Sequence, residues 1–172
     1  MEKKYELTDE ILEVGERLLH RIKALRDFGD VRKSDIGGWI ESEYNLSYDD
    51  DCWVYGEAKV YDDAEIYGNA KVCDFAEVFG EANVYAYAEV NGCARVCGVA
   101  RVEKKSDYIV FKNWWSSGRY FTWTRSNDMW TVGCFYGTGE ELIKKAYADS
   151  EESGREYERF VKLVESIKQE FK

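Results

Sequence analysis

The chain has 172 residues, of which 45% are apolar and 34% are charged, and its formal net charge at pH 7 is −10. This length allows one or two compact domains, and the negative charge argues against binding to nucleic acid by long-range attraction. No run of eighteen apolar residues occurs and the first ten residues lack the apolar core of a signal peptide, so we expect a cytoplasmic protein with no membrane partner.

Residues 5–28 carry two apolar stretches on either side of Gly15-Glu16, a short turn signal. This pattern predicts a β-hairpin, with a helix over 16–27 as the alternative. In strand alternation His20 shares a face with apolar residues, which favours a half-buried, hydrogen-bonded histidine over a catalytic one. We assign residues 1–45 to this hairpin and to a cap in which Trp39 and Trp53 close the open end of the next domain.

The central part of the chain repeats with a period of six residues. Each alanine is followed two residues later by a β-branched aliphatic, so that both would face one side of a strand. A period of six matches neither a helix nor a heptad, and it predicts a β-solenoid with a narrow interior. The alanines are Ala58, Ala64, Ala70, Ala76, Ala82, Ala88, Ala94 and Ala100. The same two slots extend upstream to Cys52 and Val54, and less cleanly to Leu46 and Tyr48.

The Ala-x-Val-x-x-x unit resembles the hexapeptide repeat of left-handed parallel β-helices. The resemblance covers residues 46–102 and implies a three-sided solenoid of eighteen residues per coil and about three coils, in a mainly β protein. The residue after each aliphatic is often aromatic here, and in this the chain resembles β-helix proteins of phages and prophages. Members of the superfamily are homotrimers, so the resemblance also implies a homotrimer as the first partner.

Stacking at eighteen residues per coil predicts ladders of opposite charge on the outer walls, and these support the three-sided geometry independently of the repeat. Aromatic stacks are predicted in the same way, with Tyr61 over Phe79 and Tyr67 over Tyr85. The three charge ladders are Lys59, Glu77, Arg95; Glu65, Asn83, Arg101; and Lys71, Glu89.

Acyltransferases of the hexapeptide family use a histidine as general base, and His20 lies before the repeat. We therefore nominate no catalytic residue, and acyl or nucleotidyl transfer stays as an alternative that needs an unusual carboxylate base. The five cysteines lack a C-x-x-C pair, and four of them occupy repeat positions, so we expect packing thiols, no metal and no cofactor. Acidic residues at the corners are interpreted as solvated, with a calcium site or mimicry of nucleic acid as the alternatives.

After Val102 the period stops, and residues 107–172 are predicted to form an α+β domain. Three strands around 108–111, 119–125 and 129–135 form an antiparallel sheet. A capping box at Thr138 opens one helix, and Ser150 or Ser153 opens a second, amphipathic helix.

Aromatic and arginine residues concentrate in this C-terminal domain, and only one face of its sheet can be covered by two helices. Accessible rings beside guanidinium groups suit a ligand with a ring and a phosphate. The alternative is that these side chains fill a small core and an interface. The predicted ligand-binding residues are Trp114, Trp115, Arg119, Tyr120, Trp123 and Arg125.

These observations predict a non-catalytic homotrimeric binding protein. The likeness to phage-borne proteins suggests that its other partner is a nucleotide-like small molecule, held as a sequestered signal, or a host protein of a defence system, with the host cytoplasm as the location. A structural assembly protein is the remaining alternative to binding and to group transfer.

Overall fold

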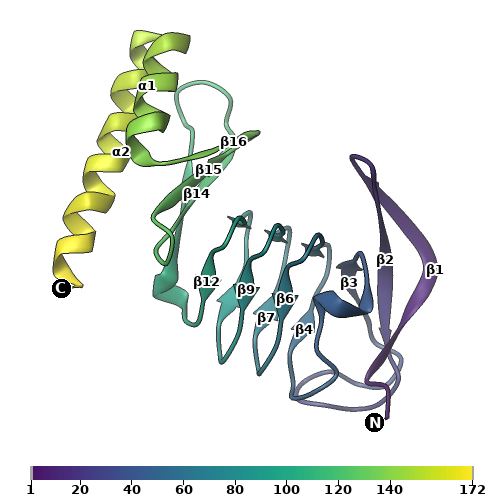
Figure 1. The fold of residues 1–172 in the computed structure, drawn as a ribbon. Coiled ribbons are helices and arrows are strands. Elements are labelled where there is room, and N and C mark those ends of the chain that lie inside the picture. The colour runs from purple at the N-terminus through teal and green to yellow at the C-terminus, as the bar shows by residue number, and fades with distance from the viewer. Residues whose placement is uncertain (1, 172) are drawn as a thin grey trace.

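The structure is a computed structural model that describes residues 2–171. An N-terminal hairpin leads into a β-solenoid of about four turns, and a sheet with two helices follows at the far end (Figure 1). The prediction of a mainly β solenoid with a C-terminal α+β domain is confirmed.

The first two strands, β1 (Tyr5–Val14) and β2 (Arg17–Ala24), form an antiparallel hairpin. Its turn contains Gly15 at a φ of 62°, a backbone conformation that glycine adopts without steric cost. The hairpin prediction is therefore confirmed, and the alternative of a helix over 16–27 is wrong. Strand β2 pairs with β3 (Ile36–Ile40), which pairs in turn with the solenoid.

The solenoid has three parallel stacks of short strands, ordered β3-β5-β8-β11, β4-β7-β10 and β6-β9-β12. Partners within the repeat lie eighteen residues apart, as Lys59, Glu77 and Arg95 show. The strands are β4 (Trp53–Val54), β5 (Lys59–Val60), β6 (Glu65–Ile66), β7 (Lys71–Val72), β8 (Glu77–Val78), β9 (Asn83–Val84), β10 (Glu89–Val90), β11 (Arg95–Val96) and β12 (Arg101–Val102).

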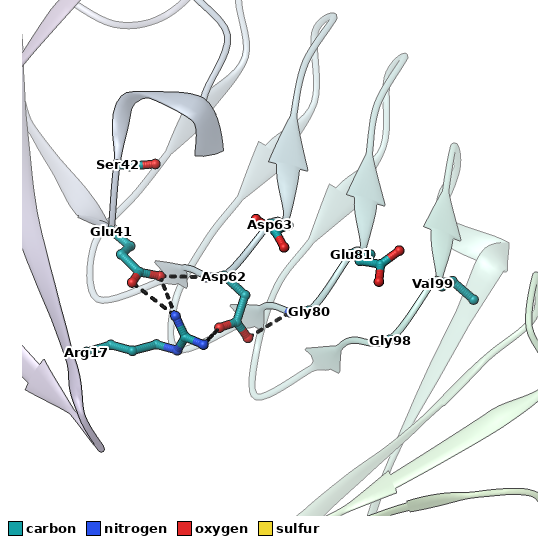
Figure 2. A pocket seen from close by; sticks show the side chains of 9 residues that line it. All are labelled: Arg17, Glu41, Ser42, Asp62, Asp63, Gly80, Glu81, Gly98 and Val99. Carbon is teal, nitrogen blue, oxygen red and sulfur yellow. Dashed lines mark hydrogen bonds and ion pairs between the residues drawn. The ribbon is translucent and has the colours of Figure 1, made fainter.

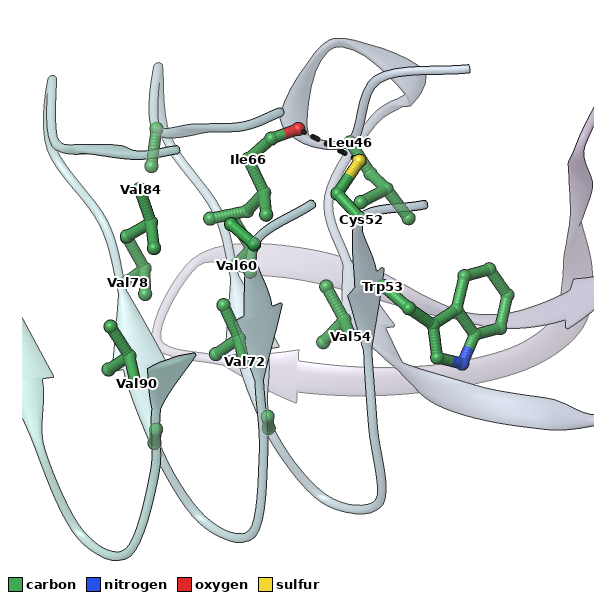
Figure 3. Packing of buried hydrophobic residues seen from close by; sticks show 14 of the residues in the cluster. Leu46, Cys52, Trp53, Val54, Val60, Ile66, Val72, Val78, Val84 and Val90 are labelled. Carbon is green, nitrogen blue, oxygen red and sulfur yellow. Dashed lines mark hydrogen bonds between the residues drawn. The ribbon is translucent and has the colours of Figure 1, made fainter. Parts of the chain in front are cut away.

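The repeating alanines and aliphatics point into the solenoid, where each is at most 1% exposed. Figure 3 shows the aliphatic side chains stacked in rows along the interior. An alanine beside each aliphatic keeps the three walls close, because any longer side chain would overfill so narrow a core.

The solenoid has about four turns and not about three, because it starts earlier than the alanine repeat. Gly38 takes the small slot and Ile40 pairs with Val60. The assignment of Leu46 to the small slot is wrong: Leu46 pairs with Ile66, twenty residues away, and so takes the aliphatic slot. Two extra residues lie between Leu46 and Val54. From Val54 onward the spacing between paired residues is eighteen, because Val54 pairs with Val72. A short 3₁₀ turn, η1 (Glu43–Asn45), precedes Leu46.

The outer ladders have the predicted register. The Glu77 carboxylate lies 3.3 Å from the Lys59 ammonium and 3.2 Å from the Arg95 guanidinium, in coils on either side. Tyr61 stacks on Phe79 with ring centroids 5.1 Å apart, and Tyr67 stacks on Tyr85 at 5.2 Å. In the third ladder Lys71 lies above Glu89, but the ion-pair partner of Lys71 is Asp30 at 2.8 Å.

The two predicted capping tryptophans lie in different places. Trp53 is 1% exposed and packs edge-on against Phe28 and Tyr5 at the N-terminal end, as expected for a plug. Trp39 lies on the outer wall, where it packs with Leu19 and Tyr61 under the hairpin. The strand register explains the difference, because Trp39 occupies the outward slot of Lys59.

Backbone polarity sets the chemistry at each end of the solenoid. Each coil donates its N–H groups to the carbonyls of the next coil, as Lys59 N does to Ala76 O at 2.9 Å. The backbone N–H groups of the last coil therefore have no following coil to which they can donate. Side-chain hydroxyl groups of the C-terminal domain accept two of these hydrogen bonds. Arg95 N donates to Thr122 Oγ1 at 2.9 Å, and Arg101 N donates to Ser126 Oγ at 2.7 Å. The C-terminal domain thus closes the open end of the solenoid.

A 3₁₀ turn, η2 (Lys105–Asp107), leads into a sheet of β13 (Tyr108–Lys112), β14 (Tyr120–Thr124), β15 (Met129–Val132) and β16 (Phe135–Gly137). The sheet has four strands and not three, because Gly133, with a φ of 56°, turns the predicted third strand back on itself. Helices α1 (Gly139–Asp149) and α2 (Glu151–Glu170) pack on the face that carries Trp123 and Trp130. The capping box at Thr138 is present, and Ser150 caps α2.

Candidate functional site

Two of the six predicted binding residues belong to the packed interior of the C-terminal domain. Trp123 is fully buried, and its indole N–H donates to Asp128 Oδ1 at 2.8 Å. Trp115 is half-buried, stacks on Phe160 at 5.9 Å and donates to Ser153 Oγ at 3.2 Å. Both rings therefore have partners within the domain.

Arg125 and Trp114 lie outside the packed interior of the domain. The Arg125 guanidinium stacks on Phe171 at 4.1 Å and lies 3.8 Å from Asp107. Trp114 is 68% exposed in the turn after β13 and contacts Trp115 edge-on. The structure therefore does not gather the six residues at one place.

Arg119 and Tyr120 line a hollow between the solenoid and the C-terminal sheet, which we call the interdomain cleft. Its volume is about 320 Å³, at the lower end of the range for small-molecule sites. Tyr120 begins strand β14 and Arg119 directly precedes it, and the last coils of the solenoid provide the opposite wall. The lining residues are Phe75, Glu77, Cys93, Arg95, Arg119, Tyr120 and Gly133.

The two arginines of the interdomain cleft have different surroundings. Arg95 is fixed, because its guanidinium bonds Glu77 at 3.2 Å and the carbonyl of Gly133, and lies 5.1 Å from the Phe79 ring. Arg119 is exposed and forms no ion pair with any carboxylate among residues 2–171. With Glu77 balancing Arg95, the cleft keeps one positive charge, next to the 62% exposed ring of Phe75 and the 44% exposed ring of Tyr120.

Sequence reasoning missed the solenoid side of this cleft. Phe75 and Arg95 belong to the repeat and are separated from Arg119 by more than twenty residues. A local signal for Phe75 was present: four of the eight residues that directly precede a repeating alanine are Glu, Asp or Asn, and a large apolar side chain there has no place in the core. No pattern in the sequence shows which wall the C-terminal sheet covers.

A larger hollow of about 520 Å³ lies along one corner of the solenoid, at the tip of the hairpin (Figure 2). It is acidic, and two of its four carboxylates, Glu41 and Asp62, are engaged in ion pairs and hydrogen bonds. Arg17 bonds Glu41 at 3.0 Å and also pairs with Asp62. Glu41 accepts the backbone N–H of Asp62 at 2.8 Å, and Asp62 accepts that of Gly80 at 3.0 Å. These bonds fix the hairpin to the corner, so Glu41 and Asp62 have a structural role.

Comparison with known proteins gives a partial match. No family model matches the chain. A stretch of 43 residues is 40% identical to the uncharacterized acetyltransferase YdcK of Escherichia coli (strain K12). That stretch covers 25% of this chain and 13% of YdcK, so the likeness concerns a small part of the relative. The match and the solenoid together fit the β-helix superfamily.

The remaining titratable groups lie mostly in structural contacts. His20 is half-buried on β2, and its Nδ1 lies 3.2 Å from the carbonyl of Thr8, within the hairpin. Burial raises the pKa of the Cys73 thiol to about 11, and burial also raises the pKa of Cys97. Within residues 2–171 no group of three His, Cys, Asp or Glu side chains could hold a metal ion, and no helix is long and apolar enough to span a membrane.

Proposed function

We propose that this protein is a non-catalytic binding protein that holds a nucleotide-type ligand in the interdomain cleft. The observation that carries the proposal is Arg119, which has no carboxylate partner in the part of the chain that the structure describes and lies beside the exposed rings of Tyr120 and Phe75. A guanidinium binds a phosphate through paired charge-assisted hydrogen bonds, and an exposed ring stacks on a base. A ligand with an aromatic base and a phosphate would use both features.

Sequestration is the role that this site supports. The cleft is lined by guanidinium and aromatic groups, which suit binding. His20, the histidine considered above as a general base, is held in the hairpin at the other end of the solenoid (Figure 1). The resemblance to phage-borne β-helix proteins suggests that the ligand is a nucleotide signal withdrawn from a host. A host defence protein bound at the same face is the outcome to consider if no small ligand binds.

Titration calorimetry of the full chain against nucleoside monophosphates and cyclic nucleotides tests this function. We expect Arg119→Gln to weaken binding roughly 10- to 100-fold, since a charge-assisted hydrogen bond contributes about 1.5–3 kcal/mol. Tyr120→Ala should weaken it less, because stacking contributes about 0.5–1.5 kcal/mol.

The matched control is Arg155→Gln, which removes an exposed arginine of α2 that pairs with Glu151. It should bind as the unmodified chain does. No heat with any nucleotide, or equal binding by the Arg119→Gln variant, would contradict the nucleotide proposal. If Trp114, Trp115 and Arg119 could all become alanine with a change in stability alone, the structural assembly role would be favoured.

We also propose that the chain assembles as a homotrimer through the β6-β9-β12 face. The hairpin packs on the β3-β5-β8-β11 face and Asp30 contacts the β4-β7-β10 face, which leaves the third face to neighbouring chains. That third face carries the Tyr67–Tyr85 stack and borders Tyr87, which is 81% exposed. Native mass spectrometry should show three chains, and Tyr87→Glu should give folded monomers. A monomeric unmodified chain would exclude the trimer.

A second candidate function is acetyl transfer, which is favoured by the name of the relative YdcK. This chemistry needs a base near neutrality beside the acceptor, and the repeat contains no histidine. Incubation with acetyl-coenzyme A and a panel of amine and hydroxyl acceptors tests it by release of free coenzyme A. Release above background that depends on an acceptor would favour the enzyme; its absence would leave binding as the better supported function.

A further inference from the structure

Lys4 is a fully buried lysine that contacts a fully buried cysteine at the N-terminal end of the solenoid. Its Nζ lies 3.3 Å from Cys52 Sγ, and both residues are 0% exposed. The amine also donates to the Cys52 carbonyl at 2.9 Å and to the carbonyls of Asp49 and Asp50 at 3.4 Å each. Lys4 precedes β1, so the contact joins the start of the hairpin to the first coil.

Backbone polarity explains why an amine lies here. The carbonyls of the first coil have no preceding coil to donate to them, and Lys4 supplies donors in its place. Tyr5 does the same for the Leu46 carbonyl, to which its hydroxyl donates at 2.8 Å. The unpaired carbonyl groups of the first coil explain why Lys4 donates to carbonyl oxygens. They do not explain why the Cys52 thiol also lies within reach of the amine.

The surroundings favour the uncharged forms of both groups. No carboxylate forms an ion pair with Lys4 among residues 2–171, and the Phe28 ring lies 4.9 Å from its Nζ. Burial lowers the pKa of the Lys4 amine, and burial raises the pKa of the Cys52 thiol. An uncharged amine has a free lone pair and can act as a nucleophile toward an oxidised sulfur.

We propose that Lys4 and Cys52 form a covalent sulfur–nitrogen crosslink when the protein meets hydrogen peroxide. In the first step, while the segment before β1 is open to water, the Cys52 thiol loses its proton and the thiolate attacks peroxide; the sulfur becomes a sulfenic acid and the peroxide is reduced to water. In the second step Lys4 Nζ attacks Sγ, the S–N bond forms, the S–O bond breaks, and a second water leaves with a proton from nitrogen. The sum is one amine, one thiol and one peroxide giving one sulfenamide and two waters.

Peroxide reaches the pair by local opening of the segment before β1. Glu2 and Lys3 are exposed, and this opening breaks few contacts: the ion pair of Lys3 with Glu43 at 2.8 Å, the hydrogen bond from Leu25 N to the Lys4 carbonyl and the hydrogen bonds of the Lys4 amine. Once formed, the crosslink closes a loop from residue 4 to residue 52. A cross-link over a loop of this length restricts the unfolded chain, so Tm should rise by about 10 °C.

Peptide mapping of the peroxide-treated full chain tests the proposal. We expect a peptide pair joined through Lys4 and Cys52, lighter than the sum of its parts by about 2 Da because two hydrogens are lost. Trypsin should no longer cleave after Lys4, and dithiothreitol should restore both peptides and the original Tm.

Variants separate the crosslink from ordinary thiol oxidation. Cys134→Ser, which removes an exposed thiol, should still crosslink, whereas Cys52→Ala should not. Lys4→Arg keeps N–H donors for the carbonyl oxygens but lacks a nucleophilic amine, so its Cys52 should gain oxygen instead. If the unmodified protein yields oxygenated Cys52 with Lys4 unlinked, or unchanged Cys52 while Cys134 is oxidised, the proposal is wrong, whether or not the variants fold.

Discussion

At the scale of single residues, the corners of the solenoid are fixed by one backbone conformation that recurs every six residues. The residue two before each repeating alanine has a positive φ of 56° to 69°. Glycine or aspartate fills this corner position in all cases but one: Gly56, Asp62, Gly68, Asp74, Gly80, Ala86, Gly92 and Gly98. In Asp62 and Asp74 the side chain also accepts the corner N–H of the next coil. Ala86 has neither advantage.

We expect Ala86→Gly to stabilise the protein by about 0.5–1 kcal/mol. The left-handed conformation costs an alanine about 1–2 kcal/mol, and the added freedom of a glycine in the unfolded chain offsets part of the gain. The matched change is Gly92→Ala, whose new Cβ would meet no atom within 4 Å, so that it reports the backbone cost alone. It should destabilise by a similar amount. Urea denaturation measures both, and a destabilising Ala86→Gly would contradict the argument.

At the scale of elements, the C-terminal sheet serves as the missing next coil. Thr122 is fully buried, and its hydroxyl accepts the N–H of Arg95, whereas Ser126 accepts the N–H of Arg101 at the surface. Thr122→Val keeps the shape but leaves a buried N–H without an acceptor, which costs about 1–3 kcal/mol. Ser126→Ala should cost less, because water can replace an exposed acceptor. Denaturation of the two variants checks the order, and equal losses would contradict the capping role.

The elements show what the sequence could and could not predict. The period of six fixed the strands from Lys59 to Val102 and the register of their ladders, because every coil repeats the same two inward slots. The first turn was missed because Gly38 replaces alanine and two residues are inserted before Val54. The last strand was missed because the turn at Gly133 lies inside an apolar run.

The candidate site depended on tertiary contacts that no local pattern contains. The sequence singled out Arg119 and Tyr120 by composition, but it grouped them with Trp123, whose ring fills the core beneath the helices. Arg95 and Phe75 line the cleft because the face of the sheet that carries Thr122 packs against the last coils of the solenoid. Alternation along β14 separates the two faces, but it does not say which of them meets the solenoid.

At the scale of the whole molecule, buried phenol and thiol groups on the outer walls couple stability to alkaline pH. Burial, followed by the nearby Glu77 carboxylate, raises the pKa of Tyr61 from 10.0 to about 12. A group with a raised pKa in the folded state holds its proton while the unfolded chain loses it. Its stabilising effect is therefore complete below pH 10 and is lost as the pH rises to about 12. Cys73 acts in the same way between pH 9 and about 11.

We expect the free energy of unfolding to fall steeply above pH 9, and Tyr61→Phe to remove part of that slope. A shift of two pKa units corresponds to about 2–3 kcal/mol, so the variant should lose less stability between pH 9 and 12 by about that amount. The matched control is Tyr44→Phe, since Tyr44 is 91% exposed and lies outside the proposed trimer face, so the variant should leave the slope unchanged. Urea denaturation across this pH range measures the slopes. Equal slopes for all three proteins would contradict the prediction. They would show that the pKa of Tyr61 is the same in the folded and the unfolded chain, and therefore that its hydroxyl is not buried as described.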